Sequence, residues 1–298
     1  MPHSQRPEIR LAQPAGAHLR HRISVSQLTT FHWSLLEDVV GFHDAGFTNI
    51  GLWRRKLCDF GEERGVDLIR DSGLNVTSFS HAGGFTGSDG LSFDDALDDA
   101  RDALHWAAEL QADCLVVIAG ARNNHTQRHV RRILVDALRE LGNAGAERGV
   151  QIALQFSEGA PGNRWSFLDT LKSAGDLLDL CDHPYVGMVF DMFHMCRERE
   201  LRRRIAEFAP LIKLTTVADA RIASTSDDDR CLPGQGILPL SEIMRALEAS
   251  GYTGAYDLQL TNQTCRLTDY AALLSDCRRA LEGMIPGFLT SGSEPYPR

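Results

Sequence analysis

Two ionisable side chains close an apolar stretch in the middle of the chain. The stretch reads Tyr185-Val-Gly-Met-Val-Phe-Asp-Met-Phe-His194, so Asp191 ends a run of strand length and His194 follows three residues later. A carboxylate and an imidazole at the exit of a buried strand can serve as general base and general acid. In the structural alternative, Asp191 caps the next helix and His194 is a surface residue. We favour catalysis, because ionisable groups at strand ends cluster at active sites.

Other ionisable residues also follow apolar runs of strand length. Glu158 is a second candidate base and His81 a second candidate acid, so both join Asp191 and His194 as predicted catalytic residues. The structural alternatives are a solvated loop position for Glu158 and a turn cap for His81.

Three cations and one indole are candidate substrate contacts. Arg54 and Arg230 could clamp an anionic or enolate oxygen, and Lys56 follows the same strand as Arg54. Ion pairs with nearby acids, such as Asp59, are the structural alternative and would contribute little at the surface. Trp53 could form a wall of the cleft, although packing in the core is the commoner fate of tryptophan.

These residues need a scaffold that brings many strand ends together. Apolar runs predict strands at 22–26, 47–53, 75–80, 114–119, 150–155, 186–191, 211–216 and 255–260. Helical periodicity predicts helices from Ser34 and at 62–71, 92–110, 127–148, 165–181, 198–208, 240–250 and 267–283. Alternation of strand and helix at a spacing of about 30 residues favours a single-domain (β/α)₈ TIM barrel over an open doubly wound sheet. Chemistry is then expected in the loops that follow the strands.

Composition and charge indicate the extent of the domain, the class of partner and the cellular compartment. The barrel is expected over 22–285, with a polar N-terminal arm at 1–21 and a C-terminal tail at 286–298. A net charge of −9 argues against a nucleic-acid partner, and no apolar run approaches the roughly 20 residues of a membrane span. Without a visible signal peptide, and with seven cysteines that lack CxxC spacing, cytoplasmic residence is the expectation. The arm and the tail could supply contacts for a homodimer.

Short motifs along the chain resemble those of the sugar phosphate isomerase/epimerase family, the xylose-isomerase-like TIM barrels. They are Gln27-Leu-Thr-Thr30, Gly51-Leu-Trp-Arg-Arg-Lys56, Gly73-Leu-Asn-Val-Thr-Ser78, His81-Ala-Gly-Gly84, Ile152-Ala-Leu154, Val189-Phe-Asp-Met-Phe-His194 and Gly234-Gln-Gly236. Their order and spacing over 22–285 carry the resemblance. It implies a divalent metal ion held by Glu, Asp, His and Glu at the ends of strands five to eight.

On that pattern the metal-ligand positions fall on Gln155, Asp191, Thr216 and Gln259. Only Asp191 keeps the family's residue type, and a register shift of one would replace Thr216 by Thr215. Both glutamates have become amides, which keep their size but lose the negative charge. A further acidic position of the family, in the loop before the seventh helix, is Gln235.

The exchanges all remove metal-binding capacity, so we expect no metal ion and no other cofactor. A weak residual site at Asp191 and His194 is the alternative. Gln155, Gln259, Thr216 and Gln235 are instead expected to contact the small-molecule substrate.

The predicted function is that of a metal-independent isomerase/epimerase-like enzyme. It would use acid–base proton transfer on a small polar substrate that is carbonyl-bearing or polyhydroxylated, with elimination or cyclisation in a specialised pathway as related outcomes. A conventional metal-dependent sugar isomerase or epimerase and a non-catalytic small-molecule-binding barrel are the alternatives. The sequence has no GxSxG, P-loop or GxGxxG motif, so hydrolase, NTPase and dinucleotide functions lack their signals.

Overall fold

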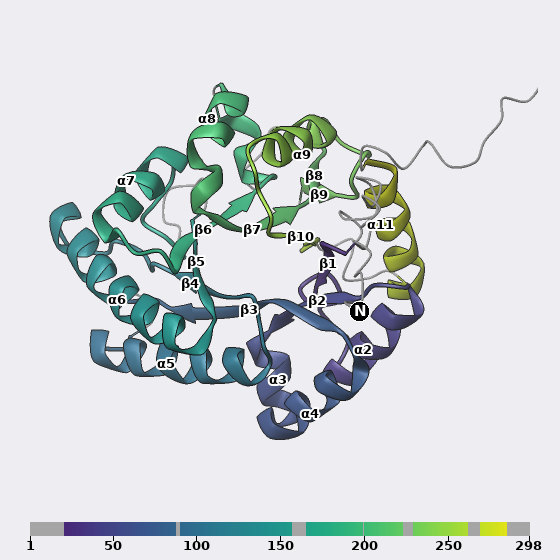
Figure 1. The fold of residues 1–298 in the computed structure, drawn as a ribbon, viewed down its shortest axis with the longest axis horizontal. Coiled ribbons are helices and arrows are strands. Elements are labelled where there is room, and N and C mark those ends of the chain that lie inside the picture. The colour runs from purple at the N-terminus through teal and green to yellow at the C-terminus, as the bar shows by residue number, and fades with distance from the viewer. Residues whose placement is uncertain are drawn as a thin grey trace, which may run out of the picture.

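Parallel strands close into a barrel with helices on the outside. The structure is a computed structural model and describes residues 21–87, 90–156, 165–198, 200–222, 229–261 and 269–284. Within these residues the strand order around the barrel is β1-β10-β7-β6-β5-β4-β3-β2 (Figure 1). The predicted (β/α)₈ TIM barrel is therefore confirmed. The predicted arm, apart from His21, and the predicted tail lie outside the described residues.

The barrel strands agree with the predicted ones to within a few residues. They are β1 (Ile23–Ser26), β2 (Asn49–Trp53), β3 (Asn75–Gly83), β4 (Cys114–Ile118), β5 (Gln151–Gln155), β6 (Val186–Asp191), β7 (Ile212–Val217) and β10 (Ala255–Leu258). Their apolar sequences reflect burial on both faces, against the helices outside and against one another inside.

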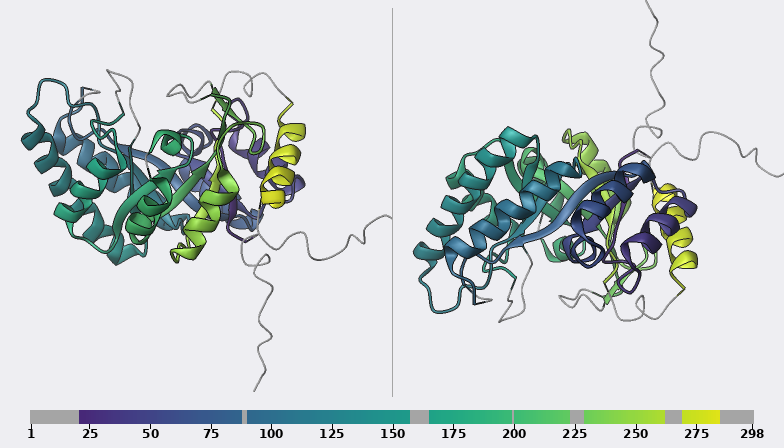
Figure 2. Two further views of the ribbon diagram at one scale, coloured as in Figure 1. Left: turned by 90° about the horizontal axis from the view of Figure 1, so that it is seen from above. Right: turned by 90° about the horizontal axis from the view of Figure 1, so that it is seen from below.

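The helices lie along the outside of the strands in the side views of Figure 2. They are α2 (Leu35–Asp44), α3 (Arg54–Phe60), α4 (Glu62–Ser72), α5 (Phe93–Glu109), α6 (Gln127–Arg148), α7 (Leu171–Cys181), α8 (Leu201–Phe208), α9 (Leu240–Ala249) and α11 (Tyr270–Met284). The short 3₁₀ helices are η1 (His194–Arg197) and η2 (Ala209–Leu211). In the described part of the chain, none of the helices is both long enough and apolar enough to cross a membrane.

Local signals explain where several helices begin. Ser34 accepts a hydrogen bond from the backbone N–H of Glu37, whose side chain in turn accepts from the Ser34 backbone, which makes a capping box at the start of α2. Thr170 and Ser173 form the same motif at α7, so this helix begins at Leu171 and not near residue 165 as predicted.

A short helix and a hairpin were not predicted from the sequence. The seven-residue helix α3 is too short for its apolar periodicity to stand out, and it ends at Gly61, whose φ of 97° breaks the helix before α4. The segment 219–236, for which neither a helix nor a strand was predicted, contains a small antiparallel hairpin of β8 (Asp219–Ala220) and β9 (Arg230–Cys231). This hairpin carries a residue of the candidate site.

The inside of the barrel holds its own apolar cluster. It consists of Cys114, Val116, Ala153, Val189, Leu214 and Ala255. Because side chains alternate between the two faces of a strand, the residues two positions further along β6, β7 and β10 also face inward. These are Asp191, Thr216 and Asp257, which form the next layer toward the C-terminal ends of the strands.

Candidate active site

Asp191 and Arg230 form a buried ion pair at the C-terminal end of β6. Each residue is 1% exposed. One terminal nitrogen of Arg230 lies 2.8 Å from Asp191 Oδ2, and the other lies 3.3 Å from Oδ1. The backbone N–H of Phe193 also donates to Oδ1 at 3.0 Å, and the guanidinium lies 4.4 Å from the centre of the Phe193 ring. Both charges are therefore held in fixed positions.

His194 completes this cluster from η1. It is 5% exposed, and its Nε2 lies 3.3 Å from an Arg230 terminal nitrogen and 3.8 Å from Asp191 Oδ2. A guanidinium only donates hydrogen bonds, so Nε2 is the acceptor in this geometry. The structure thus brings together three predicted site residues from two separate places in the chain, the end of β6 with η1 and the strand β9.

The ion pair changes the chemistry expected of Asp191. Burial opposes its ionisation, but the positive charge and hydrogen bonds of Arg230 outweigh burial and lower the pKa of Asp191 to about 2. A carboxylate with so low a pKa is a weak base. The geometry therefore corrects one expectation, because Asp191 is poorly suited to remove a proton. Arg230 is held by Asp191, and its contact with a substrate oxygen stays a prediction.

Lys56, a predicted substrate contact, forms a buried ion pair with Asp38. Its ammonium group is buried beneath the start of α3 and donates to Asp38 Oδ2 at 2.7 Å, to the Thr30 carbonyl at 2.8 Å and to the Gln27 carbonyl at 3.3 Å. These contacts use all three donors of the ammonium group. Burial raises the pKa of Asp38 to about 7 and lowers the pKa of Lys56. The pair fixes the β1–α2 loop to α2.

Arg54 is engaged outside the barrel. It donates to Asp99 Oδ2 at 2.7 Å and to Asp102 Oδ2 at 3.1 Å, both on α5. The alternative that Arg54 forms an ion pair is therefore supported, although its partners are Asp99 and Asp102 and not Asp59, which lies near Arg55. Arg54 contributes its charge to the rim of the barrel, whereas its hydrogen bonds go to α5.

His81 has the properties of a proton acceptor. It lies near the C-terminal end of β3, is partly buried, and packs edge-on against Trp165 with ring centres 5.0 Å apart. Burial and the charge of Arg54 lower the pKa of His81. The imidazole is therefore neutral near pH 7 and can accept a proton, whereas the sequence analysis cast it as an acid.

The remaining predicted contacts surround the barrel mouth or lie beyond it. Gln155 ends β5 and Gln259 follows β10, and both are half-buried. Trp53 ends β2 and packs against Phe31, with ring centres 5.3 Å apart. Glu158 lies outside the described residues.

Gln235 belongs to a loop that is built around Asp219. The side chain of Gln235 is exposed. The carboxylate of Asp219 is buried and accepts hydrogen bonds from the backbone N–H groups of Gly234, Gly236 and Leu238 at 2.9, 3.0 and 3.0 Å. The same carboxylate accepts from its neighbour Ala220 at 2.8 Å. Asp219 therefore organises this loop, and it stands at the start of the hairpin that carries Arg230.

Asp257 was missed by the sequence analysis. It is 2% exposed inside the barrel, between Thr216 of β7 and Ser24 of β1. Burial raises the pKa of Asp257 to about 7. The available signal was an acidic residue within a strand that is otherwise apolar, a position that is rarely occupied without a reason.

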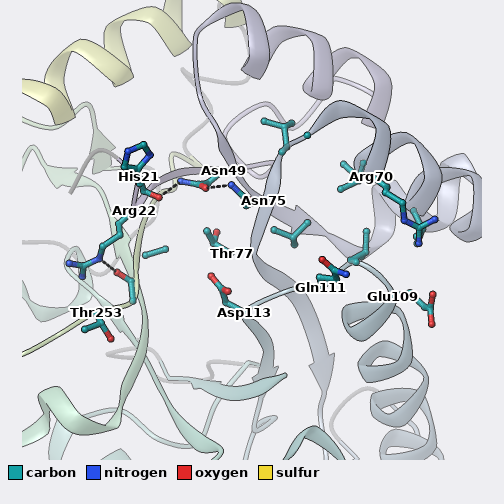
Figure 3. Close-up of a pocket in the computed structure, with 18 residues that line it drawn as sticks. His21, Arg22, Asn49, Arg70, Asn75, Thr77, Glu109, Gln111, Asp113 and Thr253 are labelled. Carbon is teal, nitrogen blue, oxygen red and sulfur yellow. Dashed lines mark hydrogen bonds between the residues drawn. The ribbon is translucent and has the colours of Figure 1, made fainter. Parts of the chain in front are cut away.

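Two cavities lie at opposite ends of the barrel. One of about 540 Å³ opens at the N-terminal ends of β1, β2 and β3, where Asn49, Asn75, Thr77 and Asp113 line it (Figure 3). Another of about 420 Å³ lies beside Trp53 at the C-terminal ends of β1 and β2. TIM barrels catalyse reactions at the C-terminal end, so we place the candidate site there despite the larger cavity at the opposite end.

The residues at the family's metal positions do not suit a divalent cation. Two amides and a hydroxyl carry no charge, and both oxygens of Asp191 already bind Arg230. Across the described residues there is no group of three His, Cys, Asp or Glu side chains that could hold a metal ion. A divalent ion would therefore lack the negative charge that offsets the loss of its hydration shell.

Comparison with known proteins identifies the family of this chain. The sequence profile of one family, described as xylose isomerase-like TIM barrel, matches residues 42–277. The 3-dehydroshikimate dehydratase of Pseudomonas putida is 26% identical over 257 residues, which cover 83% of this chain and 39% of that enzyme. The chain thus spans about two fifths of the length of the dehydratase that it matches.

A second relative is similar in sequence, and a solved structure is similar in fold. The inosose isomerase of Halalkalibacterium halodurans is 21% identical over 197 residues, covering 64% of this chain and 67% of that protein. A crystal structure of a protein from Sinorhizobium meliloti superposes with a TM-score of 0.82 at 24% identity, covering 90% of this chain and 100% of the other.

Proposed function

Because the chain belongs to the xylose isomerase-like TIM barrel family, we propose that it is an enzyme that moves a proton at a carbon beside a carbonyl group. The substrate is small and polyhydroxylated, and the reaction proceeds without a divalent metal ion. Isomerisation, epimerisation and the elimination of water can all begin with this step. The names of the relatives, a dehydratase and an isomerase, support this range of reactions.

The ion pair of Asp191 and Arg230 carries the proposal. Removing a proton beside a carbonyl places negative charge on the carbonyl oxygen, and a fixed positive charge near that oxygen stabilises it. A guanidinium that is almost fully buried acts in surroundings of low polarity, where its field is strong. In this scheme Arg230 provides that charge, and Asp191 keeps the guanidinium in place.

The other residues take roles that suit their surroundings. His81 is neutral and partly exposed, so it accepts the proton from carbon. Gln155 and Gln259 are half-buried at the mouth and bind substrate oxygens through their amide groups. Glu158 remains a candidate for a second acid or base.

The test combines metal analysis with turnover. Protein treated with a chelator and desalted would be assayed with 3-dehydroshikimate and with inosose, and its metal content measured by mass spectrometry. We expect turnover of one of these substrates by metal-free protein, with a loss of at least 100-fold in Arg230→Gln and His81→Phe, the range typical of one electrostatic or acid–base group. Arg101→Gln is the matched control and should retain most of the activity, because the ion pairs of Arg101 with Asp98 and Glu140 lie on the outer helices. Activity that disappears with the metal and returns on its addition would overturn the proposal.

A further inference from the structure

A row of polar side chains crosses the barrel interior above the apolar cluster. Strand pairing places Asp191 beside Thr216, Thr216 beside Asp257, and Asp257 beside Ser24. Asp191 is neutralised by Arg230. Asp257 has no cation within ion-pair distance among the described residues. The carboxyl group of Asp257 is therefore not held by an ion pair with any of the described residues, and hydrogen bonds must hold it.

Two neighbouring oxygens of this row lack hydrogen-bond partners in the described structure. They are Oγ1 of Thr216 and Oδ1 of Asp257, and both residues are 2% exposed. Buried polar groups in native proteins are nearly always hydrogen-bonded to protein, water or ligand. Because strand pairing sets these two side chains side by side, one small polar group could satisfy both oxygens.

The opposite side of Asp257 is already occupied. The Ser24 hydroxyl accepts a hydrogen bond from Thr77 Oγ1 at 2.8 Å and hydrogen-bonds Asp257. At Gly51, an added Cβ would lie 2.5 Å from Asp257 Oδ2. The carboxyl group thus occupies the space that the glycine leaves, with Oδ1 2.9 Å from the same point, and Oδ1 is the oxygen that has no hydrogen-bond partner among the described residues.

The chemistry of the two oxygens limits what can bind. An anion would be repelled by the carboxyl group, and a divalent cation would need several more charged ligands. An apolar group would leave both oxygens unsatisfied. A hydroxyl group fits both, because it donates one hydrogen bond and accepts another.

We propose that Thr216 and Asp257 form a hydroxyl-binding subsite at the floor of the active site. One hydroxyl group of the substrate donates to Asp257 Oδ1 and accepts from Thr216 Oγ1. The subsite lies one layer below Gln259, which is two residues further along the chain and half-buried at the mouth. This inference rests on the proposed function for the class of substrate, and it assigns a specificity role to residues outside the reacting groups.

Binding of unreactive cyclic polyols tests the subsite independently of turnover. The probes are myo-inositol and shikimate, which lack the ketone, and their affinity for the full chain would be measured by calorimetry. Thr216→Val keeps the shape of the side chain and removes the hydroxyl, so affinity for at least one probe should fall tenfold or more. Thr215→Val is the matched control, because Thr215 is also buried but faces away from the barrel interior, and its affinity should stay within twofold.

Variants of Asp257 provide the second arm. Asp257→Leu should abolish binding of the probe, whereas Asp257→Asn should retain part of it through the amide oxygen. The subsite is overturned if Thr216→Val and a folded Asp257→Leu bind the probes as the wild type does, or if the wild type binds neither. Probe binding that is lost in the variants, together with no turnover of any ketone substrate, would retain the subsite and reject the proposed function.

Discussion

Asp191 and Arg230 are both almost completely buried, and each compensates the charge of the other. Breaking such a pair from one side leaves an uncompensated charge in the interior, which is far more costly than losing an exposed pair. The interaction therefore has a structural role in addition to the proposed catalytic one. Variants at these two positions can separate the two roles.

Arg230→Gln should lower the free energy of unfolding by about 3–5 kcal/mol, because it leaves the Asp191 carboxylate buried without a cation. Urea denaturation measures this change. Arg54→Gln is the control and should cost less than about 1 kcal/mol, because the acids that Arg54 contacts are largely exposed. The double variant Asp191→Leu/Arg230→Met should recover much of the lost stability. Equal costs for the two arginine variants would contradict the burial argument.

The low pKa of Asp191 predicts a defined dependence of stability on pH. Because the folded-state pKa of about 2 lies below the unfolded value of about 3.9, ionised Asp191 stabilises the fold above pH 4, and this contribution is lost as the pH falls toward 2. It should amount to about 2 kcal/mol. Unfolding of the wild type and of Asp191→Asn, compared from pH 6 to pH 2, gives the contribution as a difference. Parallel pH profiles would show that Asp191 has an ordinary pKa.

Among the elements, the β8–β9 hairpin places a charged side chain in the site. It delivers Arg230 to the end of β6 from a position 39 residues later in the chain. Asp219, at the base of the hairpin, accepts hydrogen bonds from the next loop with both carboxylate oxygens. The charge of Asp219 thus fixes the hairpin and the 234–238 loop relative to each other.

Asp219→Asn should loosen this loop. The amide keeps one acceptor oxygen but turns an N–H₂ group toward backbone N–H donors, which leaves at least one of them unsatisfied. We expect a stability loss of about 1–3 kcal/mol. Hydrogen exchange should accelerate at Gly234, Gly236 and Leu238, with the amides of β4 as an internal control. Unchanged protection at these three amides would show that the loop is held by other contacts.

At the scale of the whole molecule, proteins that share this barrel differ in the residues at their strand ends and in their loops. The barrel of strands is the same in all of them. The positions that correspond to the family's metal ligands lie on β5, β6, β7 and just after β10. Arg230 reaches the same place from outside the barrel. We therefore expect that metal affinity depends on removing this arginine as well as on restoring the ligands.

The variant Gln155→Glu/Thr216→His/Gln259→Glu/Arg230→Ala should bind manganese or zinc near stoichiometrically, because it restores three ligands and frees Asp191. The same three ligand substitutions with Arg230 retained should bind metal at least tenfold more weakly, since the guanidinium holds both oxygens of Asp191. Mass spectrometry of desalted protein after incubation with each metal makes the comparison. Equal metal content in the two variants would show that Arg230 does not exclude a cation.

The sequence by itself determined the barrel and the end at which chemistry is expected. Strand and helix periodicities are local properties, and eight alternations leave few folds, so the strands were placed correctly to within a few residues. Asp191 and His194 were selected because Asp191 ends a buried strand and His194 follows it by three residues. The amide exchanges at Gln155 and Gln259 were also visible, although their consequence for metal binding remains to be tested.

Only the tertiary structure decided which charges meet. The partners of Lys56 and Arg54 are Asp38 and Asp99, which lie 18 and 45 residues away in the chain, and the spacing of residues does not encode such contacts. The roles of Asp257 and Arg230 depend on strand register and on a hairpin too short to give a periodic signal. Burial then set the pKa values, because the pKa of a carboxyl group depends on the surroundings created by the whole fold.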